Sequence, residues 1–320
     1  MKKEWYISFH GGEDASTLNN IHVYSAAGKW LRKALNKSSL PQKVSLRELR
    51  GFTIDPDGNL FVVNAFKDFS QVLRFRGKLN TQEQHDFMDV FVQYDAATNP
   101  GLKHPFNAVF DSAGNLYVTS QDTNVTLRYH GPKTKDGVPA AAMPLPLSLH
   151  GLAGSGLYPG TFCASAKQVP HGLVVVREAV FVGSLLYVAD RDADCVKKYD
   201  TATGEYRGEI GARGVMDKPI HLAVKDGTMY VGNRGNESVV KCDLRTETVA
   251  PFIPPQSGGL KNPAGLAFGN DGYFYVASRD TREILRYQIA DGKPDSRPFI
   301  TGLADDPEFI EPMPADRASA

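Results

Sequence analysis

Short apolar runs, broken by glycine-containing turns, recur along the chain in one order. A first run is followed by a turn, a second run ending in Tyr-Val or Phe-Val, a polar loop, and a third run that usually ends in a basic and an aromatic residue. Runs of this length, joined by Asp-Gly and Gly-Asn turns, predict β-hairpins. The complete copies span 51–75, 105–129, 170–199, 219–242 and 263–287.

A further copy is split between the two ends of the chain. The segment 5–8 matches a second run that lacks a first, and 20–24 matches the third run. The missing first run is at 307–311, where it follows a polar linker and opens with a proline, as its counterparts do. We expect these ends to pair, because pairing would remove an exposed sheet edge.

A repeat of roughly 40–50 residues with four strands predicts the blades of a propeller. We therefore predict an all-β protein, a single six-bladed β-propeller domain in which the N- and C-terminal strands close one blade. The predicted blades are 1–40 with 306–313, 49–104, 105–169, 170–218, 219–262 and 263–305. The recurring pattern resembles the NHL-repeat propellers over nearly the whole chain. The SMP-30/gluconolactonase and strictosidine-synthase groups are similar six-bladed folds.

Charge and cysteine content narrow the choice of partners and compartment. Basic and acidic residues number 36 each, and this balance argues against nucleic acid or a membrane surface as a partner. No apolar segment follows Lys2 and Lys3, and no stretch is long enough to span a bilayer, so we expect a cytoplasmic protein. Cys163, Cys195 and Cys242 form no closely spaced pair, which predicts buried thiols. The oligomeric state stays open.

Histidines are the sharpest candidates for chemistry. Family propellers generally place their sites where the loops that enter the first strands meet the loops that join second to third strands. Four of the eight histidines fall in these loops: His10, His104, His171 and His221. Imidazoles around a channel could hold a divalent metal, with zinc, iron or copper favoured over calcium. Alternatively, each histidine bonds to a neighbouring loop without metal.

The histidine pattern resembles the NHL-type propeller of peptidyl-α-hydroxyglycine α-amidating lyase, in which histidines of inner strands hold zinc. It is also similar to streptogramin lyases, although those have seven blades. The positions equivalent to His171 and His221 in the other blades hold other residues: Gly51, Asn107, Gly265 and Phe309.

Arginines and acidic residues form the second group of candidates. Arg191, Arg234 and Arg279 recur after the second strand of three successive blades and could hold a carboxylate or phosphate. They could instead fix loops through neighbours such as Asp192, and recurrence in a repeat favours that structural role. Glutamates on the closing strand could transfer a proton, or could be solvated strand-end residues: Glu308 and Glu311.

Resemblance to SMP-30-type lactonases implies a divalent metal bound by a carboxylate with Asn and Asp partners. Residues available for that set are Glu308, Glu311, Asn107, Asp190 and Asn233. Resemblance to strictosidine synthase implies a single catalytic glutamate in the channel, again Glu308 or Glu311.

The leading hypothesis is a metal-assisted lyase or hydrolase that acts on a small molecule at the central channel. His171 and His221, with His10 or His104, would hold the metal, and the substrate would also contact Arg50, Asn107 and Asn233. The long glycine-rich segment 151–169, within the insertion 131–169, would shield the site or be a simple insertion. The alternative is a non-catalytic NHL-type propeller that binds a ligand or a protein partner.

Overall fold

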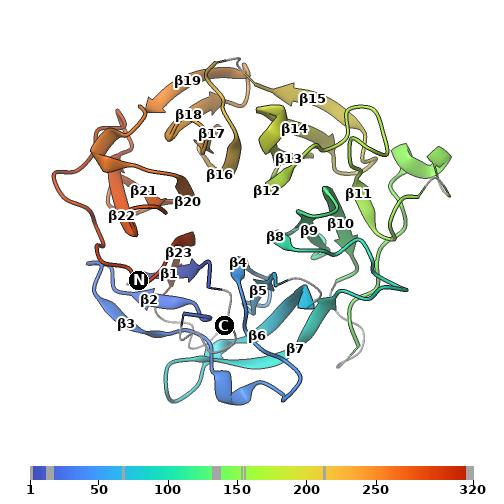
Figure 1. Ribbon diagram of the computed structural model, residues 1–320, viewed down its shortest axis with the longest axis horizontal. Helices are drawn as coiled ribbons and strands as arrows, with labels where there is room; N and C mark the ends of the chain where they lie inside the picture. The colour runs from blue at the N-terminus through green and yellow to red at the C-terminus, as the bar shows by residue number, and fades with distance from the viewer. Residues whose placement is uncertain are drawn as a thin grey trace.

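Six antiparallel sheets surround a central channel and follow one another in chain order (Figure 1). The computed structural model describes residues 3–11, 18–66, 69–131, 138–152, 154, 156–211 and 214–314. Five sheets have four strands, and the sixth has three strands in regular pairing. The prediction of an all-β, six-bladed propeller is confirmed.

Each blade runs from an inner strand at the channel to an outer strand at the periphery. From the channel outwards, the first three blades are β23 (Pro307–Pro314), β1 (Lys3–Phe9), β2 (His22–Tyr24) and β3 (Trp30–Lys33); β4 (Leu49–Ile54), β5 (Leu60–Asn64), β6 (Gln71–Leu79) and β7 (His85–Gln93); and β8 (Pro105–Phe110), β9 (Leu116–Ser120), β10 (Val125–Tyr129) and β11 (Thr161–Cys163).

The other three blades follow the same order. They are β12 (Val176–Val182), β13 (Leu185–Asp190), β14 (Cys195–Asp200) and β15 (Tyr206–Ile210); β16 (Pro219–Lys225), β17 (Thr228–Asn233), β18 (Ser238–Asp243) and β19 (Thr248–Ile253); and β20 (Pro263–Phe268), β21 (Tyr273–Ser278) and β22 (Glu283–Gln288). Short 3₁₀ turns lie at Lys37–Ser39, Leu147–Leu152, Arg191–Ala193 and Ser257–Gly259.

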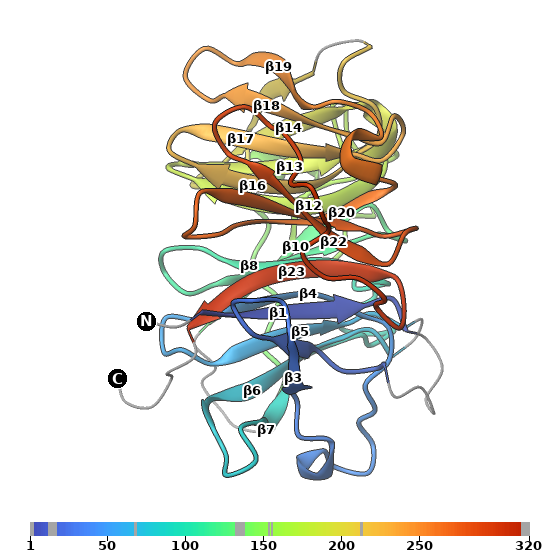
Figure 2. The same cartoon turned by 90° about the vertical axis from the view of Figure 1, so that its left-hand side faces the viewer.

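The two ends of the chain close the first blade, as predicted. β23 pairs with β1 in antiparallel register, with Ile310 opposite Ile7 and Pro312 opposite Trp5. Figure 2 shows these two strands side by side. This pairing ties the first and last blades together, so the ring has no open strand edge at its seam.

The core lies between neighbouring blades. Tyr187 of the fourth blade packs in one buried cluster with Leu222 and Val231 of the fifth. Tyr230 of the fifth blade lies in another with Phe274 of the sixth, their ring centroids 5.2 Å apart. Each sheet thus buries apolar side chains on both faces, and blade-to-blade packing holds the ring together.

A β-bulge in every inner strand directs side chains into the channel. In the second blade Leu49 lies opposite Asn64 but Phe52 lies opposite Val62, so the inner strand has one residue more than its partner. The other inner strands shift register near the same point. An extra residue re-aims the side chains around it. The two residues after the first residue of each strand therefore form two rings around the channel.

The entrance ring contains Arg50, Phe106, Arg177, Ile220, Ala264 and Glu308, all of which line one cavity. The middle ring contains Gly51, Asn107, Glu178, His221, Gly265 and Phe309. Glycine is required in the middle ring where neighbouring inner strands approach each other closely. A Cβ atom on Gly265 would lie 2.5 Å from the Ile310 nitrogen.

The fourth blade differs from the prediction in its inner strand. The sequence pattern places that strand at 170–173, whereas β12 begins at Val176 and pairs with β13 through a turn at Gly183 and Ser184. Val182 lies opposite Leu185, so this short hairpin determines the register. Residue 178 therefore occupies the middle-ring position for which His171 was expected.

The described part of the segment 151–169 does not cover the channel; residues 153 and 155 lie outside the described ranges. Thr161–Cys163 forms the outer strand of the third blade, and Tyr158 packs against Gly101. The preceding turn reaches the fourth blade, where the Ser148 amide donates to the Thr203 carbonyl at 3.0 Å. In Figure 1 this green segment lies at the outer edge of the ring. The segment therefore supplies the outer strand of the third blade. The turn before it links the third and fourth blades at the periphery.

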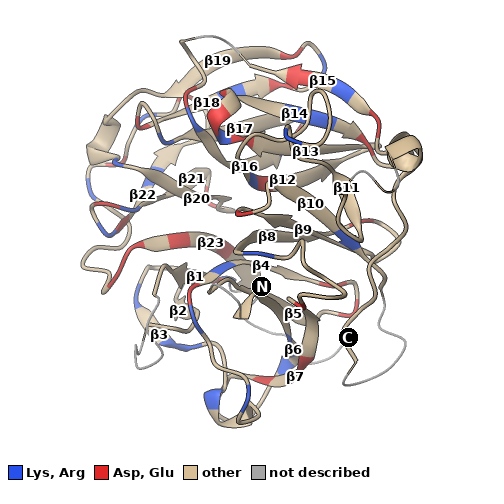
Figure 3. Ribbon diagram, turned by 45° about the vertical axis from the view of Figure 1, so that its right-hand side comes forward, with Lys and Arg blue, Asp and Glu red and all other residues tan. Residues whose placement is uncertain are grey.

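Charged residues of both signs are spread over the outer strands and loops (Figure 3). All three cysteines are free and buried, and burial raises the pKa of the Cys163 thiol. Within the described residues, no helix has the length and apolar character needed to cross a membrane.

Candidate functional site

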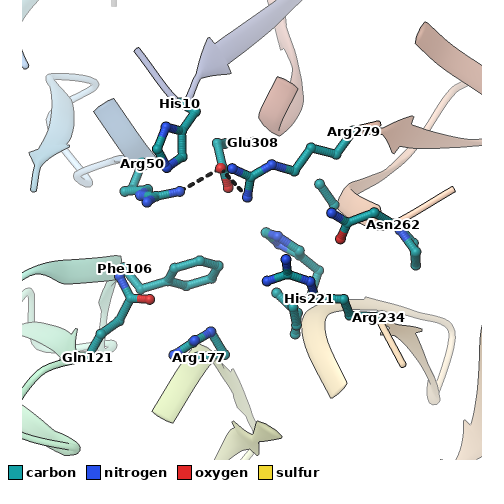
Figure 4. Close-up of a pocket in the computed structure, with 13 residues that line it drawn as sticks. His10, Arg50, Phe106, Gln121, Arg177, His221, Arg234, Asn262, Arg279 and Glu308 are labelled. Carbon is teal, nitrogen blue, oxygen red and sulfur yellow. Dashed lines mark ion pairs between the residues drawn. The ribbon is translucent and has the colours of Figure 1, made fainter. Parts of the chain in front are cut away.

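A cavity of about 290 Å³ opens at the end of the channel where the inner strands begin. We call it the arginine pocket, because four guanidinium groups line it: Arg50, Arg177, Arg234 and Arg279 (Figure 4). Its other polar lining residues are His10, Gln121, His221, Asn262 and Glu308, and Phe106 forms part of the wall. The entrance ring and the loops above it thus build a strongly cationic site.

Glu308 is held between two of these arginines. Its Oε1 lies 2.5 Å from Arg50 Nη1 and 2.7 Å from Arg279 Nη1 (Figure 4). The side chain is 2% exposed, and burial by itself would raise its pKa. The charges of Arg50 and Arg279 outweigh burial and hold the pKa of Glu308 below its ordinary value. Glu308 is therefore an ionised carboxylate that positions two guanidinium groups.

Glu48 extends this network behind Arg50. Arg50 donates to Glu48 Oε1 at 2.5 Å, and His104 Nε2 contacts the same oxygen at 2.8 Å. His10 Nε2 lies 3.7 Å from it. Burial would raise the pKa of Glu48, but the hydrogen bond from His104 and the charge of Arg50 lower it to about 2. Two predicted histidines thus surround a carboxylate at the rim of the site.

The remaining two guanidinium groups have no carboxylate partner among the described residues. Arg177 is buried, donates to the Val176 carbonyl at 2.7 Å and lies 5.7 Å from the centroid of the Phe106 ring. Burial, and then the charges of Arg191, Arg50 and Arg234, lower the pKa of Arg177 to about 10. Burial and the charges of Arg279 and Arg191 also lower the pKa of Arg234. An anion bound in the pocket would stabilise the charged form of both guanidinium groups.

His221 forms the floor of the pocket. Its Nδ1 lies 3.0 Å from Glu178 Oε2, which also accepts the Leu222 amide at 3.0 Å. A carboxylate behind Nδ1 favours the tautomer that carries its proton there, so Nε2 is left as an acceptor. The ring is 1% exposed and lines the cavity, close to the channel axis in Figure 4. No described residue hydrogen-bonds to Nε2, so His221 has the arrangement of an oriented base.

The structure brings only part of the predicted site together. Six predicted residues line the arginine pocket: His10, Arg50, His221, Arg234, Arg279 and Glu308. His104 stands behind it, between Glu48 and Asp122. Arg191 pairs with Asp192 on the rim, 2.6 Å from Nε to Oδ1, which is the structural role considered above for these arginines.

Four predicted residues lie elsewhere. The His171 ring is exposed and stacks on Tyr206 of the outer strand β15, with centroids 4.9 Å apart, so it does not join His221 at the channel. Asn233 is fully buried and donates to the Val215 carbonyl, which fixes its own loop rather than a substrate. Asn107 and Glu311 line the opposite end of the channel.

Arg177, Glu178 and Glu48 were missed by sequence reasoning. The first two were missed because the inner strand of the fourth blade was placed six residues too early, at Pro170 rather than Val176. The Gly183-Ser184 pair between two apolar runs was the available signal, since such pairs mark two-residue hairpins. Glu48 precedes its strand by one residue and had no pattern to distinguish it.

The lining of the pocket does not fit the predicted divalent metal. Four guanidinium groups would repel a dication, and the predicted ligand His221 directs Nδ1 to Glu178. No group of three or more His, Cys, Asp or Glu side chains in the described part of the chain is arranged to hold a metal ion. The divalent metal stays a prediction from the sequence, and the chemistry of this pocket is that of its own side chains.

Comparisons with known proteins identify the fold. No family model matches this chain, and no curated protein matches it in sequence. A chain in a crystal structure of a nidogen/laminin complex is similar over 98% of this chain and 99% of its own length, with a TM-score of 0.66 at 10% identity. A streptogramin B lyase structure is similar over 80% of this chain and 70% of its own, with a TM-score of 0.51 at 15% identity. At these identities the likeness concerns the fold alone, and it places this chain among the β-propellers.

Proposed function

We propose that this protein is a lyase or hydrolase that binds a small anionic molecule in the arginine pocket. The observation that carries the proposal is that Arg177 and Arg234, which have no carboxylate partner among the described residues, share one cavity with the oriented imidazole of His221. A streptogramin B lyase of similar fold is compatible with such a use of a propeller. The loose strand pattern of the blades also supports an NHL-type repeat.

The guanidinium groups would bind the anionic part of the substrate. A carboxylate or phosphate accepts paired hydrogen bonds from guanidinium groups, and these are strong where water is excluded. Phe106 would pack against the organic part. The cavity of about 290 Å³ is at the small end of ligand sites, which run from about 300 Å³ upwards. The substrate is therefore a small molecule.

His221 would carry out the proton transfer. In a lyase reaction, Nε2 takes the proton from a carbon next to the anionic group, the C–H electron pair forms the new double bond, and the leaving group departs with its own pair. In a hydrolase reaction, Nε2 takes a proton from water while the water oxygen bonds to the substrate, and the bond to the leaving group breaks, with its electron pair going to that group. The guanidinium groups stabilise the charge that develops on the anionic group. Glu308, ionised and held between two arginines, positions them and does not donate a proton.

Anion binding is the first test. Titration calorimetry with inorganic phosphate and with succinate should show one saturable site in the unmodified protein. We expect Arg177→Met and Arg234→Met each to weaken binding by about tenfold or more, because each removes a charged donor pair. Arg245→Met is the matched control, since Arg245 is exposed and lies outside the pocket. Failure of both anions to bind would refute the anionic substrate.

Turnover is the second test. A pool of small carboxylates and phosphate esters is incubated with the protein and followed by proton NMR, and a converted compound is then tested on His221→Asn. We expect the variant to lose about 100-fold or more in kcat, because general base catalysis contributes on that scale. A variant with full kcat would remove His221 from the mechanism. Metal analysis of the same chelator-free preparation tests the predicted divalent metal.

A second candidate is a non-catalytic propeller. A chain of similar fold, matched over almost its full length, occurs in a nidogen/laminin complex. In that case the arginine pocket would receive an acidic group of a ligand or protein partner. Saturable anion binding without any turnover in the compound pool would favour this candidate over the enzyme.

A further inference from the structure

A second pocket, of about 350 Å³, lies at the opposite end of the channel. Later residues of the inner strands line it, and its charged residues are Glu178 of β12 and Glu311 of β23. We call it the glutamate pocket. Its walls are otherwise mainly apolar, with Phe52, Val180, Leu222 and Phe268 among them. No basic side chain of the described chain lines it.

Three rings lie between the two pockets. The Phe106 ring centroid is 5.3 Å from those of His221 and Phe309, and the last two are 4.7 Å apart. These rings come from the third, fifth and first blades and are almost fully buried. The three rings are therefore in contact with one another across the channel, between the entrance ring and the later residues of the inner strands.

Glu311 has no counter-charge in this pocket. Its side chain makes no ion pair or hydrogen bond with any residue that the structure describes. Lys3, on the adjacent strand β1, instead donates to Asn270 Oδ1 at 2.9 Å. Burial and the charge of Glu178 raise the pKa of Glu311 to about 8, and the charge of Lys3 opposes them only in part. A positive charge in the pocket would stabilise the ionised form of Glu311 and so lower its pKa.

A neighbouring amide adds an independent sign of an absent donor. Asn107 lines the same pocket, is 5% exposed and donates its Nδ2 to Glu178 Oε1 at 3.3 Å. Its Oδ1 is buried and has no hydrogen-bond partner among the described residues. Buried polar atoms of native proteins are nearly always paired, so Asn107 Oδ1 is an acceptor at the pocket wall that a bound donor could use.

We propose that the glutamate pocket binds an organic ammonium ion with an apolar body. Such an ion supplies positive charge to the two carboxylates, and its alkyl part packs on the apolar walls. A primary amine also supplies N–H donors for Asn107 Oδ1. A calcium ion fits less well, because it takes six to eight oxygen ligands. The two pockets share no lining residue, although Glu178 also contacts His221, and the proposal does not depend on the function proposed for the arginine pocket.

Two probes test the proposal: n-butylammonium for the glutamate pocket and inorganic phosphate for the arginine pocket. Titration calorimetry at pH 9 uses n-butylammonium, with n-butanol as the neutral control and calcium chloride as the metal arm. We expect one ammonium site, no binding of butanol or calcium, and a loss of about tenfold or more in Glu311→Gln. Arg177→Met should leave ammonium binding unchanged, and Glu311→Gln should leave phosphate binding unchanged.

Equal ammonium affinity in Glu311→Gln, or preference for calcium or butanol, would overturn the proposal. Circular dichroism and thermal unfolding check the fold of the variant, which is expected to be intact because Glu311 has no partner to lose. Val180→Phe is the second variant: it fills the pocket while keeping both carboxylates, and it should also weaken ammonium binding. Unchanged affinity in Val180→Phe would place any ammonium site elsewhere.

Discussion

The two ends of the channel have opposite electrostatics although the same six strands build both. At the entrance, the described lining residues include four guanidinium groups and one carboxylate, Glu308, and two of the four have no carboxylate partner in the described part of the chain. At the other end, Glu178 and Glu311 face no basic residue among those that line the pocket. The charge of the described lining residues is therefore unbalanced at both ends, with opposite signs.

Paired and unpaired charges also occur side by side within the entrance ring. Arg50 and Arg177 occupy equivalent positions in the second and fourth blades, and both are buried. Arg50 bridges two carboxylates, whereas Arg177 contacts a carbonyl and an aromatic ring. In a repeat fold, a position that is structural in one blade is thus free to serve a ligand in another.

The largest expected effect follows removal of a paired arginine. Arg50→Met leaves buried Glu308 with one arginine and Glu48 with its histidine contacts. We expect a loss of about 3–5 kcal/mol in the free energy of unfolding, the usual cost of breaking a buried ion pair. Urea denaturation at pH 7 measures it. A loss below about 1 kcal/mol would show that the Glu48–Arg50–Glu308 network does not stabilise the ring.

The next effect is pH-dependent and concerns the glutamate pocket. The pKa of Glu311 in the folded protein is raised to about 8, so its ionisation above the ordinary carboxyl range opposes folding. Relative to Glu311→Gln, the unmodified protein should lose on the order of 1 kcal/mol of stability per pH unit between about pH 5 and 8, and little more above that. Parallel urea titrations of both proteins from pH 5 to 9 measure the difference. A constant difference across this range would contradict the raised pKa.

The same ionisation should appear in ligand binding. Tetramethylammonium keeps its charge at every pH, so any change in its affinity reports on the protein. We expect its binding to strengthen by several-fold from pH 6.5 to 9, as Glu311 becomes ionised, and to be pH-independent in Glu311→Gln. Calorimetric titrations at three pH values suffice. Equal affinity at pH 6.5 and 9 in the unmodified protein would show that ionisation of Glu311 does not contribute to ammonium binding, and the contrast between the two ends would then be wrong.

The smallest effect is expected for Arg177, which has no carboxylate partner among the described residues. Arg177→Met removes a buried charge whose pKa is lowered to about 10, and leaves no buried carboxylate unpaired. We expect the free energy of unfolding to change by less than about 1 kcal/mol, in either direction, because an apolar residue of similar length replaces an uncompensated charge. Urea denaturation beside Arg50→Met makes the pair a matched comparison. A loss as large as that of Arg50→Met would assign Arg177 a structural role.

Local sequence was sufficient for the architecture and for much of the entrance. The recurring strands, their turns and the split first blade could be recognised because strand periodicity and turn chemistry act over a few residues. The same repeat placed Arg50, His221, Arg279 and Glu308 at the channel, because equivalent positions of successive blades converge there.

The tertiary structure alone decided which neighbouring residues share a site. The bulge in each inner strand turns consecutive side chains, such as Glu308 and Phe309, into the channel at different depths, which a two-residue period does not predict. The hairpin at Gly183 placed Arg177 and Glu178 in the ring instead of His171. Charge balance in each pocket depends on side chains from different blades, far apart in sequence, such as Glu178 and Glu311 in the glutamate pocket, so it exists only once the ring has closed.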